Sequence, residues 1–142
     1  MTEPLGRVLA LDLGDVRIGL AISDELGITA QPQGYLARTS QRADLLAIAK
    51  LVEEREVTRV VVGHPLLLSG EEGTRAREAR ETVERLRKTL AVPVELWDER
   101  LTTAQAEREL VGDGVRRSRR RKVIDSLAAA LILESWLEAH GG

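Results

Sequence analysis

The feature that most constrains the fold of this chain is an apolar run that ends in an acid, followed by a tight turn and a second apolar run. It occupies residues 8–24, VLALDLGDVRIGLAISD. The run before the acid has no polar position, which predicts a strand buried on both faces. Gly14 and Asp15 supply the turn. Large and small side chains then alternate over residues 18–23, which indicates an antiparallel return strand.

Asp12 stands where this pattern calls for an apolar residue. Desolvating a carboxylate costs several kcal/mol unless it is paired, hydrogen-bonded or bound to a metal ion. Asp12 is therefore the first candidate functional residue. The structural alternative is a carboxylate that accepts hydrogen bonds from the amides of the turn.

The middle of the chain predicts two strands and two helices. A short third strand covers residues 33–38, after the Gln31-Pro32 break, and Ser40 is a candidate N-cap for an amphipathic helix over residues 41–55. The β-branched run at 57–63 predicts a buried strand parallel to the first. Thr74 is a candidate cap for the next helix, whose apolar stripe is Ala76, Ala79, Val83, Leu86 and Leu90.

The last part predicts one strand and two more helices. Residues 92–97 form a strand, and Pro93 favours an edge position because a missing donor is tolerated there. Thr102 and Gln105 form a capping box, which predicts a short helix over 103–112. The final helix is expected over about 120–139. Because residues 127–133 contain no polar side chain, it is expected to pack on nearly every side.

The predicted order is β-β-β-α-β-α-β-α-α. It favours an α/β fold with a mixed five-stranded sheet, in which strands one, four and five are parallel, strand two is antiparallel beside strand one, and helices cover both faces. This is the RNase H-like arrangement. A length of 142 residues is the size of one domain, so we expect a single domain over residues 1–142.

Three acidic positions are expected to converge in this arrangement. Asp12 and the pair Asp98/Glu99 follow parallel strands, and ligands of open sheets bind outside such carboxyl ends. Asp125 lies on the final helix, on one stripe with apolar and small residues, so it should face the sheet. Alternation alone does not decide between Asp98 and Glu99. We favour Glu99 as the inward residue and keep Asp98 as the reserve.

Each of these acids also has a structural explanation. Glu99 could be a surface acid that interacts with a helix dipole, and Asp125 could pair with Lys122 or Arg121 one turn earlier. Together, however, three converging carboxylates would repel one another, and a pair of divalent metal ions relieves that repulsion. The hypothesis is therefore a metal site that cleaves phosphodiester bonds.

Composition restricts the kind of metal site. The chain has no cysteine, and its two histidines, His64 and His140, match no metal-binding spacing. A metal must then be held by oxygen ligands, which favours Mg²⁺ or Mn²⁺. The N-terminus lacks a signal pattern and no apolar run approaches the roughly 20 residues needed to span a bilayer, so we expect a cytoplasmic protein without a membrane partner.

A basic block precedes the final helix, although the net charge of the chain is only -2. Such a block marks either a solvated loop or a contact with a polyanion, and a GC-rich genome could also produce a run of Arg codons. Aromatic residues make up 2% of the chain and Phe is absent, so any nucleic acid should be held by its backbone and shape. The candidate nucleic-acid-binding residues of the block are Arg116, Arg117, Arg119, Arg120, Arg121 and Lys122.

Four segments spread over nearly the whole chain resemble the signature blocks of the YqgF/RuvX family. They are LDLGDVRIGLAISD, VVVGHPLLLSGEEG, WDERLTTAQAE and KVIDSLAAALIL. The resemblance implies an RNase H-like nuclease, related to Holliday junction resolvases and to enzymes that process the small-subunit (16S) ribosomal RNA precursor. It places catalytic metal ligands at Asp12, Glu99 and Asp125. The other positions that match the family are Arg17, Gly19, Gly63 and Pro65. Of these, Arg17 is added to the candidate nucleic-acid-binding residues. Asp15 and Val16 differ from the Thr-Lys or similar pair that the family has at this turn.

The function expected from the sequence is therefore metal-dependent hydrolysis of structured nucleic acid. RNA precursor processing is favoured as the general role, with junction cleavage as an activity that can coexist with it. Without an exposed apolar stripe for an obligate interface, we expect a monomer or weak homodimer, and no small-molecule cofactor. The alternatives are a non-catalytic nucleic-acid or ribosome-binding protein that retains the fold and, less favoured on length, an actin-like ATP-binding module.

Overall fold

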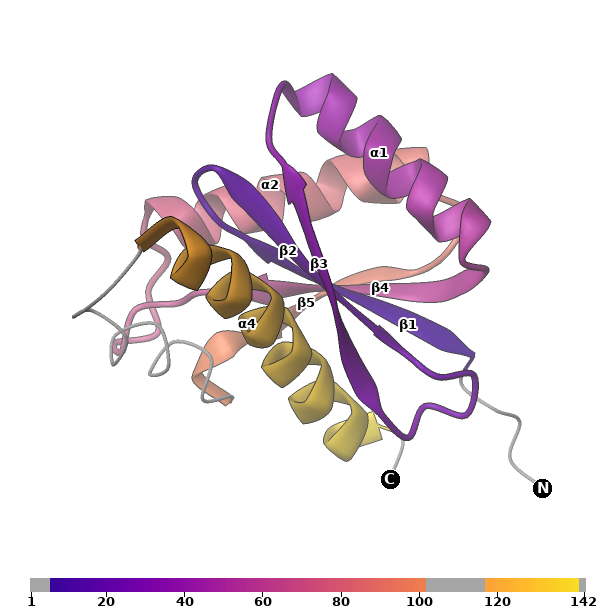
Figure 1. Ribbon diagram of the computed structural model, residues 1–142. Coiled ribbons are helices and arrows are strands. Elements are labelled where there is room, and N and C mark those ends of the chain that lie inside the picture. The colour runs from indigo at the N-terminus through magenta and orange to yellow at the C-terminus, as the bar shows by residue number, and fades with distance from the viewer. Residues whose placement is uncertain (1–5, 102–116, 141–142) are drawn as a thin grey trace.

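The described part of the chain forms a five-stranded sheet with helices on both faces (Figure 1). The computed structural model describes the backbone of residues 6–101 and 117–140, and the side chains of residues 6–101 and 126–140. No helix in these described ranges is long and apolar enough to cross a membrane. The elements are β1 (Arg7–Leu13), β2 (Arg17–Ser23), β3 (Ala30–Ala37), α1 (Gln41–Glu54), β4 (Val57–His64), α2 (Thr74–Thr89), β5 (Val94–Asp98), the 3-10 turn η1 (Glu99–Leu101) and α4 (Arg117–His140).

The strand order is β3-β2-β1-β4-β5. β1 pairs antiparallel with β2 and parallel with β4, and β4 pairs parallel with β5. The predicted strand directions are therefore confirmed, including the edge position of the strand that follows Pro93. Three carboxyl ends, those of β1, β4 and β5, lie along the same edge of the sheet.

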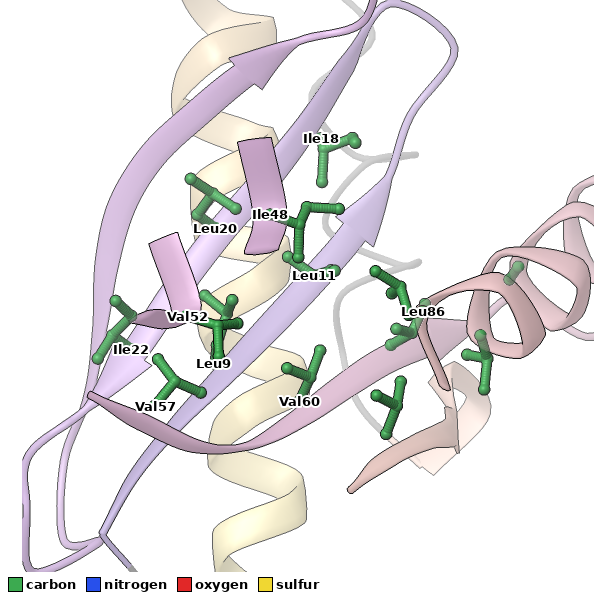
Figure 2. Packing of buried hydrophobic residues seen from close by; sticks show 14 residues of the cluster. Leu9, Leu11, Ile18, Leu20, Ile22, Ile48, Val52, Val57, Val60 and Leu86 are labelled. Carbon is green, nitrogen blue, oxygen red and sulfur yellow. The ribbon is translucent and has the colours of Figure 1, made fainter. Parts of the chain in front are cut away.

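Two separate clusters of buried side chains fill the two faces of the sheet. Leu9 and Leu11 of β1 point to the face covered by α1 and α2, and Figure 2 shows the large aliphatic side chains gathered there. Val8 and Ala10 point to the opposite face, which α4 covers. The small residues of the return strand β2 also lie under α4, and Ala21 is fully buried there. Helices on both faces were expected from the sequence.

The predicted helix boundaries agree with the structure to within one residue, except at the start of α4. The hydroxyl of Ser40 caps α1, because its Oγ accepts a hydrogen bond from Ala43 N at 3.1 Å. The prediction for α2 is wrong by one residue: Gly73 is the N-cap, Thr74 is the first helical residue, and the cap has no side-chain hydrogen bond. The predicted capping box and the helix over 103–112 lie outside the described residues.

The other boundaries that differ have physical causes. β3 begins at Ala30 rather than after Pro32, because an edge strand leaves one row of N–H groups unpaired and so tolerates the proline. α4 begins at Arg117, so the part of the basic block from 117 to 122 is helical and not a loop. The prediction that this helix packs on nearly every side is also wrong. One side faces solvent, and Leu127 is 46% exposed.

Candidate active site

Asp12 lies at the end of β1, on the face of the sheet that α4 covers. Side chains alternate along β1, so Asp12 follows Val8 and Ala10, which pack against α4. The residue is 1% exposed, and its Oδ2 atom is inaccessible to water. The structure thus places a carboxylate in the interior, as the interrupted apolar run predicted.

Gly63 of β4 places no side chain beside Asp12. Leu11 pairs with Val62, so Asp12, one residue further along β1, is level with Gly63. A Cβ atom on Gly63 would lie 2.6 Å from Ile132 Cδ1 of α4 and 3.2 Å from Cγ and Cδ of Glu99. A carbon–carbon distance of 2.6 Å is shorter than packing allows, and one of 3.2 Å would require the neighbour to shift. The missing side chain therefore lets α4 and the Glu99 carboxyl group approach the sheet at the level of Asp12.

Glu99 and Asp98 have different environments although they are neighbours in the sequence. Glu99 is 1% exposed, and its carboxyl group lies on the α4 face beside Gly63. Asp98 is held by Arg100, whose Nε lies 3.1 Å from both carboxylate oxygens and whose Nη2 lies 2.8 Å from Oδ2. This pairing lowers the pKa of Asp98, with a smaller contribution from His64. Glu99 is thus the inward acid, as favoured, and Asp98 is engaged by Arg100.

The amino-terminal half of α4 is fixed against β2 and β3 by Ser126. Its Oγ accepts a hydrogen bond from Gly34 N at 3.1 Å and donates to Leu20 O at 3.4 Å. Leu20 is the neighbour of Gly19, which pairs with Asp12. The backbone of α4 at Asp125 is therefore next to this contact with β2, the strand that pairs with Asp12. The side chain of Asp125 lies outside the described residues.

Arg17 lies at the same edge and on the same face as Asp12. It begins β2, whose first residues lie beside the end of β1, and it precedes Gly19 and Ala21 on the α4 face. Its guanidinium group is 5.2 Å from the centre of the Tyr35 ring. Of the basic block, Arg116 lies outside the described residues, and the structure describes only the helical backbone of Arg117, Arg119, Arg120, Arg121 and Lys122.

The sequence predictions include no structural role for three residues that position neighbouring elements: Gly63, Ser126 and Ser135. Gly63 was noted only as a family match, and a glycine inside a strand is the signal that could have indicated a close approach. Ser126 and Ser135 attach α4 to the strands through their hydroxyl groups, with Trp97 Nε1 donating to Ser135 Oγ at 3.0 Å. Nothing in the local sequence distinguishes these serines from solvent-exposed ones.

The two buried acids have the chemistry that Mg²⁺ or Mn²⁺ requires. Both supply carboxylate oxygens, and both come from carboxyl ends of parallel strands on one face of the sheet. Among the side chains that the structure describes, which do not include that of Asp125, no group of three or more acidic or histidine residues could hold a metal ion. Asp12 and Glu99 therefore fit a divalent ion that has at least one further ligand.

Comparison with known proteins agrees with this arrangement. The family model RuvX, described as Holliday junction resolvase, matches residues 6–139. A protein of Myxococcus xanthus with the name "Putative pre-16S rRNA nuclease" is 52% identical over 94% of this chain and 89% of its own length. One of Koribacter versatilis with the same name is 46% identical over 99% and 94%.

A solved structure shares the fold. It is the RuvC protein of Thermus thermophilus in complex with a Holliday junction substrate, which superposes with a TM-score of 0.58 at 16% identity and covers 94% of this chain and 96% of that one. This likeness confirms the RNase H-like architecture. From the extent of the family match and the identity of the relatives, the chain belongs to the RuvX family and is a nuclease that hydrolyses phosphodiester bonds.

Proposed function

We propose that this nuclease is metal-dependent and cleaves structured nucleic acid, with a precursor of the small-subunit ribosomal RNA as its main substrate and branched DNA as a second one. The observation that supports the proposal most is the burial of Asp12 and Glu99 on one face, at the edge where parallel strands end. The printed names of the relatives support the RNA substrate, and the description of the family supports the junction.

In this proposal Asp12, Glu99 and Asp125 hold Mg²⁺ or Mn²⁺. When bound, two such ions position and activate a water molecule and stabilise the charge that develops on the leaving phosphate oxygen. The chain itself supplies the rigid part of the site: Asp12 is fixed by its pairing with Gly19 of β2 and follows Leu11, which pairs with Val62 of β4, and Glu99 is fixed by its burial beside Gly63. Asp98 remains the reserve ligand, although its bonds to Arg100 argue against that role.

The first test substitutes each acid and measures cleavage. Asp12→Asn, Glu99→Gln and Asp125→Asn should each lower Mn²⁺-dependent cleavage by about 100-fold or more, because each removes a charged ligand. Asp98→Asn is the matched control and should stay within a few-fold of wild type. The metal-free variants should be as stable as wild type or slightly more stable, since one of several repelling carboxylates is gone.

The substrate is tested with one cleavage panel, in which a four-way DNA junction, a linear duplex and an RNA precursor fragment are compared with Asp12→Asn as the control. Cleavage of the RNA above all others supports the proposed order. Paired symmetric cuts on the junction by a dimer, with the RNA untouched, would reverse it, because such cuts require two active sites related by a twofold axis. Metal-dependent binding without any cleavage would favour a non-catalytic role.

We also propose that Arg17 and the basic residues from Arg116 to Lys122 bind the backbone of the substrate. The position of Arg17 at the edge that contains Asp12, and the helical backbone from 117 to 122 that leads into Asp125, support this role. Replacing Arg119, Arg120 and Arg121 with Gln should weaken binding to all sequences alike. The log–log salt dependence should flatten by roughly one unit for each lost phosphate contact. An unchanged slope would identify the block as solvated surface.

A cytoplasmic, monomeric or weakly dimeric enzyme without a small-molecule cofactor completes the proposal. Trimming an RNA precursor needs one active site per molecule, so a stable dimer is not required. The reaction also needs no membrane partner. Sedimentation of the protein with and without the RNA fragment tests this part, and a stable dimer in both conditions would contradict it.

A further inference from the structure

A side chain of α4 holds the turn that carries Glu99. η1 has only three residues, too few to hold its position by its own hydrogen bonds. The hydroxyl of Ser135 on α4 donates a hydrogen bond to Leu101 O, the last carbonyl of η1, at 3.1 Å. The same hydroxyl accepts a hydrogen bond from Trp97 Nε1 of β5 at 3.0 Å. Ser135 thus holds the chain on both sides of Glu99.

This attachment links the turn of Glu99 to the helix that carries Asp125. Ser135 is nearly three helical turns after Asp125, about 15 Å along the axis of one continuous helix. Between them, Ile132 packs into the space left by Gly63, against which the carboxyl group of Glu99 also lies. A shift of α4 therefore moves the support of Glu99 and the backbone at Asp125 together.

We infer that Ser135 is a positioning residue for cleavage, which sets the place of Glu99 relative to α4 by bridging Trp97 and Leu101. The inference rests on the proposed role of Glu99 as a metal ligand. A hydroxyl group is required because the position must donate one hydrogen bond and accept another. Alanine cannot do either, whereas threonine keeps both functions.

The experiment compares Ser135→Ala with Ser135→Thr and with Ser40→Ala. The Ser40 variant is the matched control, because it also removes a serine hydroxyl hydrogen bond, at the N-cap of α1 on the opposite face of the sheet. Three quantities are measured: amide hydrogen exchange of residues 99–101 in the metal-free protein, the affinity for Mn²⁺ by calorimetry, and kcat and KM on the RNA precursor fragment.

For Ser135→Ala we expect faster exchange of residues 99–101, weaker Mn²⁺ binding and a kcat lower by about tenfold or more at unchanged KM, since small displacements of catalytic groups are costly. Ser135→Thr should behave as wild type. Ser40→Ala should lower thermal stability without changing kcat or the exchange of residues 99–101. Wild-type kcat and Mn²⁺ affinity in Ser135→Ala would overturn the inference.

A Glu99→Gln variant, measured in the same series, separates this inference from the proposed function. If Glu99→Gln is inactive while Ser135→Ala cleaves as wild type, the proposed function stands and the positioning role is wrong. If Glu99→Gln cleaves as wild type, the metal-ligand role of Glu99 is wrong and the positioning role fails with it. Inactivity of Glu99→Gln together with a slow Ser135→Ala supports both.

Discussion

The face of the sheet under α1 and α2 is filled by large aliphatic side chains, whereas the face under α4 combines alanines with larger apolar side chains such as Trp136 and with buried polar groups. The first cluster includes Leu9, Leu11 and Leu86, all completely buried. The second contains a run of alanines on α4 and Ala10 and Ala21 on the strands. Among the described residues, the buried polar side chains belong to the α4 side of the molecule; they are Asp12, Ser23, Glu99 and Ser126.

Both faces bury apolar side chains, but only the α4 face also contains the candidate metal ligands Asp12 and Glu99. Large side chains on the first face remove much apolar surface from water, at about 25 cal/mol per Å². Small side chains on the second face let α4 lie close to the strands, so that polar groups from β1, η1 and α4 share one layer. Substitutions of packing residues on the α1/α2 face should therefore lower stability alone, whereas those on the α4 face should lower both stability and cleavage.

The largest loss of stability is expected from Leu86→Ala on the α1/α2 face. Removing this buried side chain should lower the free energy of unfolding by about 2–5 kcal/mol, because it leaves a cavity among well-packed neighbours. The molecules that remain folded should cleave at the wild-type rate. Urea unfolding, with kcat measured well below the transition, checks both parts. A loss of kcat in fully folded Leu86→Ala would show that the two faces are not independent.

A smaller loss of stability, accompanied by a loss of cleavage, is expected from Gly63→Ala. The new methyl group meets Ile132 Cδ1 and the Glu99 carboxyl group, and overpacking of this kind costs about 1–3 kcal/mol. Ile132→Val removes the Cδ1 atom, so the double variant should regain stability. Cleavage should recover only in part, because the contact with Glu99 remains. Full recovery of both quantities would assign the effect to the position of α4 alone.

The smallest effect concerns Asp98 and is visible through pH. Arg100 lowers the pKa of Asp98 below its ordinary value of 3.8, so the ionised carboxylate stabilises the folded state above that pH. This contribution is lost as the pH falls through the lower pKa of the folded protein. Asp98→Asn should therefore be less stable than wild type at pH 7, and the difference should shrink on acidification below 3.8. A difference that does not depend on pH would contradict the ion pair as its cause.

The sequence predicted those parts of the fold and site that depend on local pattern. Asp12 interrupts an apolar run, and its burial follows from the strand that contains it. The strand directions and the edge position of β5 were also predictable, since they depend on the spacing of apolar runs and on Pro93. Each of these predictions depends only on residues that are close to one another in the sequence and that form one strand or its end in the structure.

The parts that sequence could not provide depend on contacts between distant elements. Alternation did not choose between Asp98 and Glu99, because β5 ends at Asp98 and the chain turns into η1 at Glu99. Gly63 and Ser135 act on residues of distant elements, α4 and η1. A glycine inside a strand can indicate a close approach, but not which element approaches, and nothing along α4 singles out Ser135. The start of α4 at Arg117 was missed because a basic run is equally typical of a loop.

The affinity for Mn²⁺, determined by calorimetry on wild type, Asp12→Asn, Glu99→Gln and Asp98→Asn, is the most direct test of the proposed metal site. We expect wild type and Asp98→Asn to bind Mn²⁺ with similar affinity. Asp12→Asn and Glu99→Gln should each bind about 100-fold more weakly or not at all, since even outer-sphere partners of a metal are worth about 10–100-fold. Equal affinity in all four proteins, or a loss confined to Asp98→Asn, would contradict the proposed metal site.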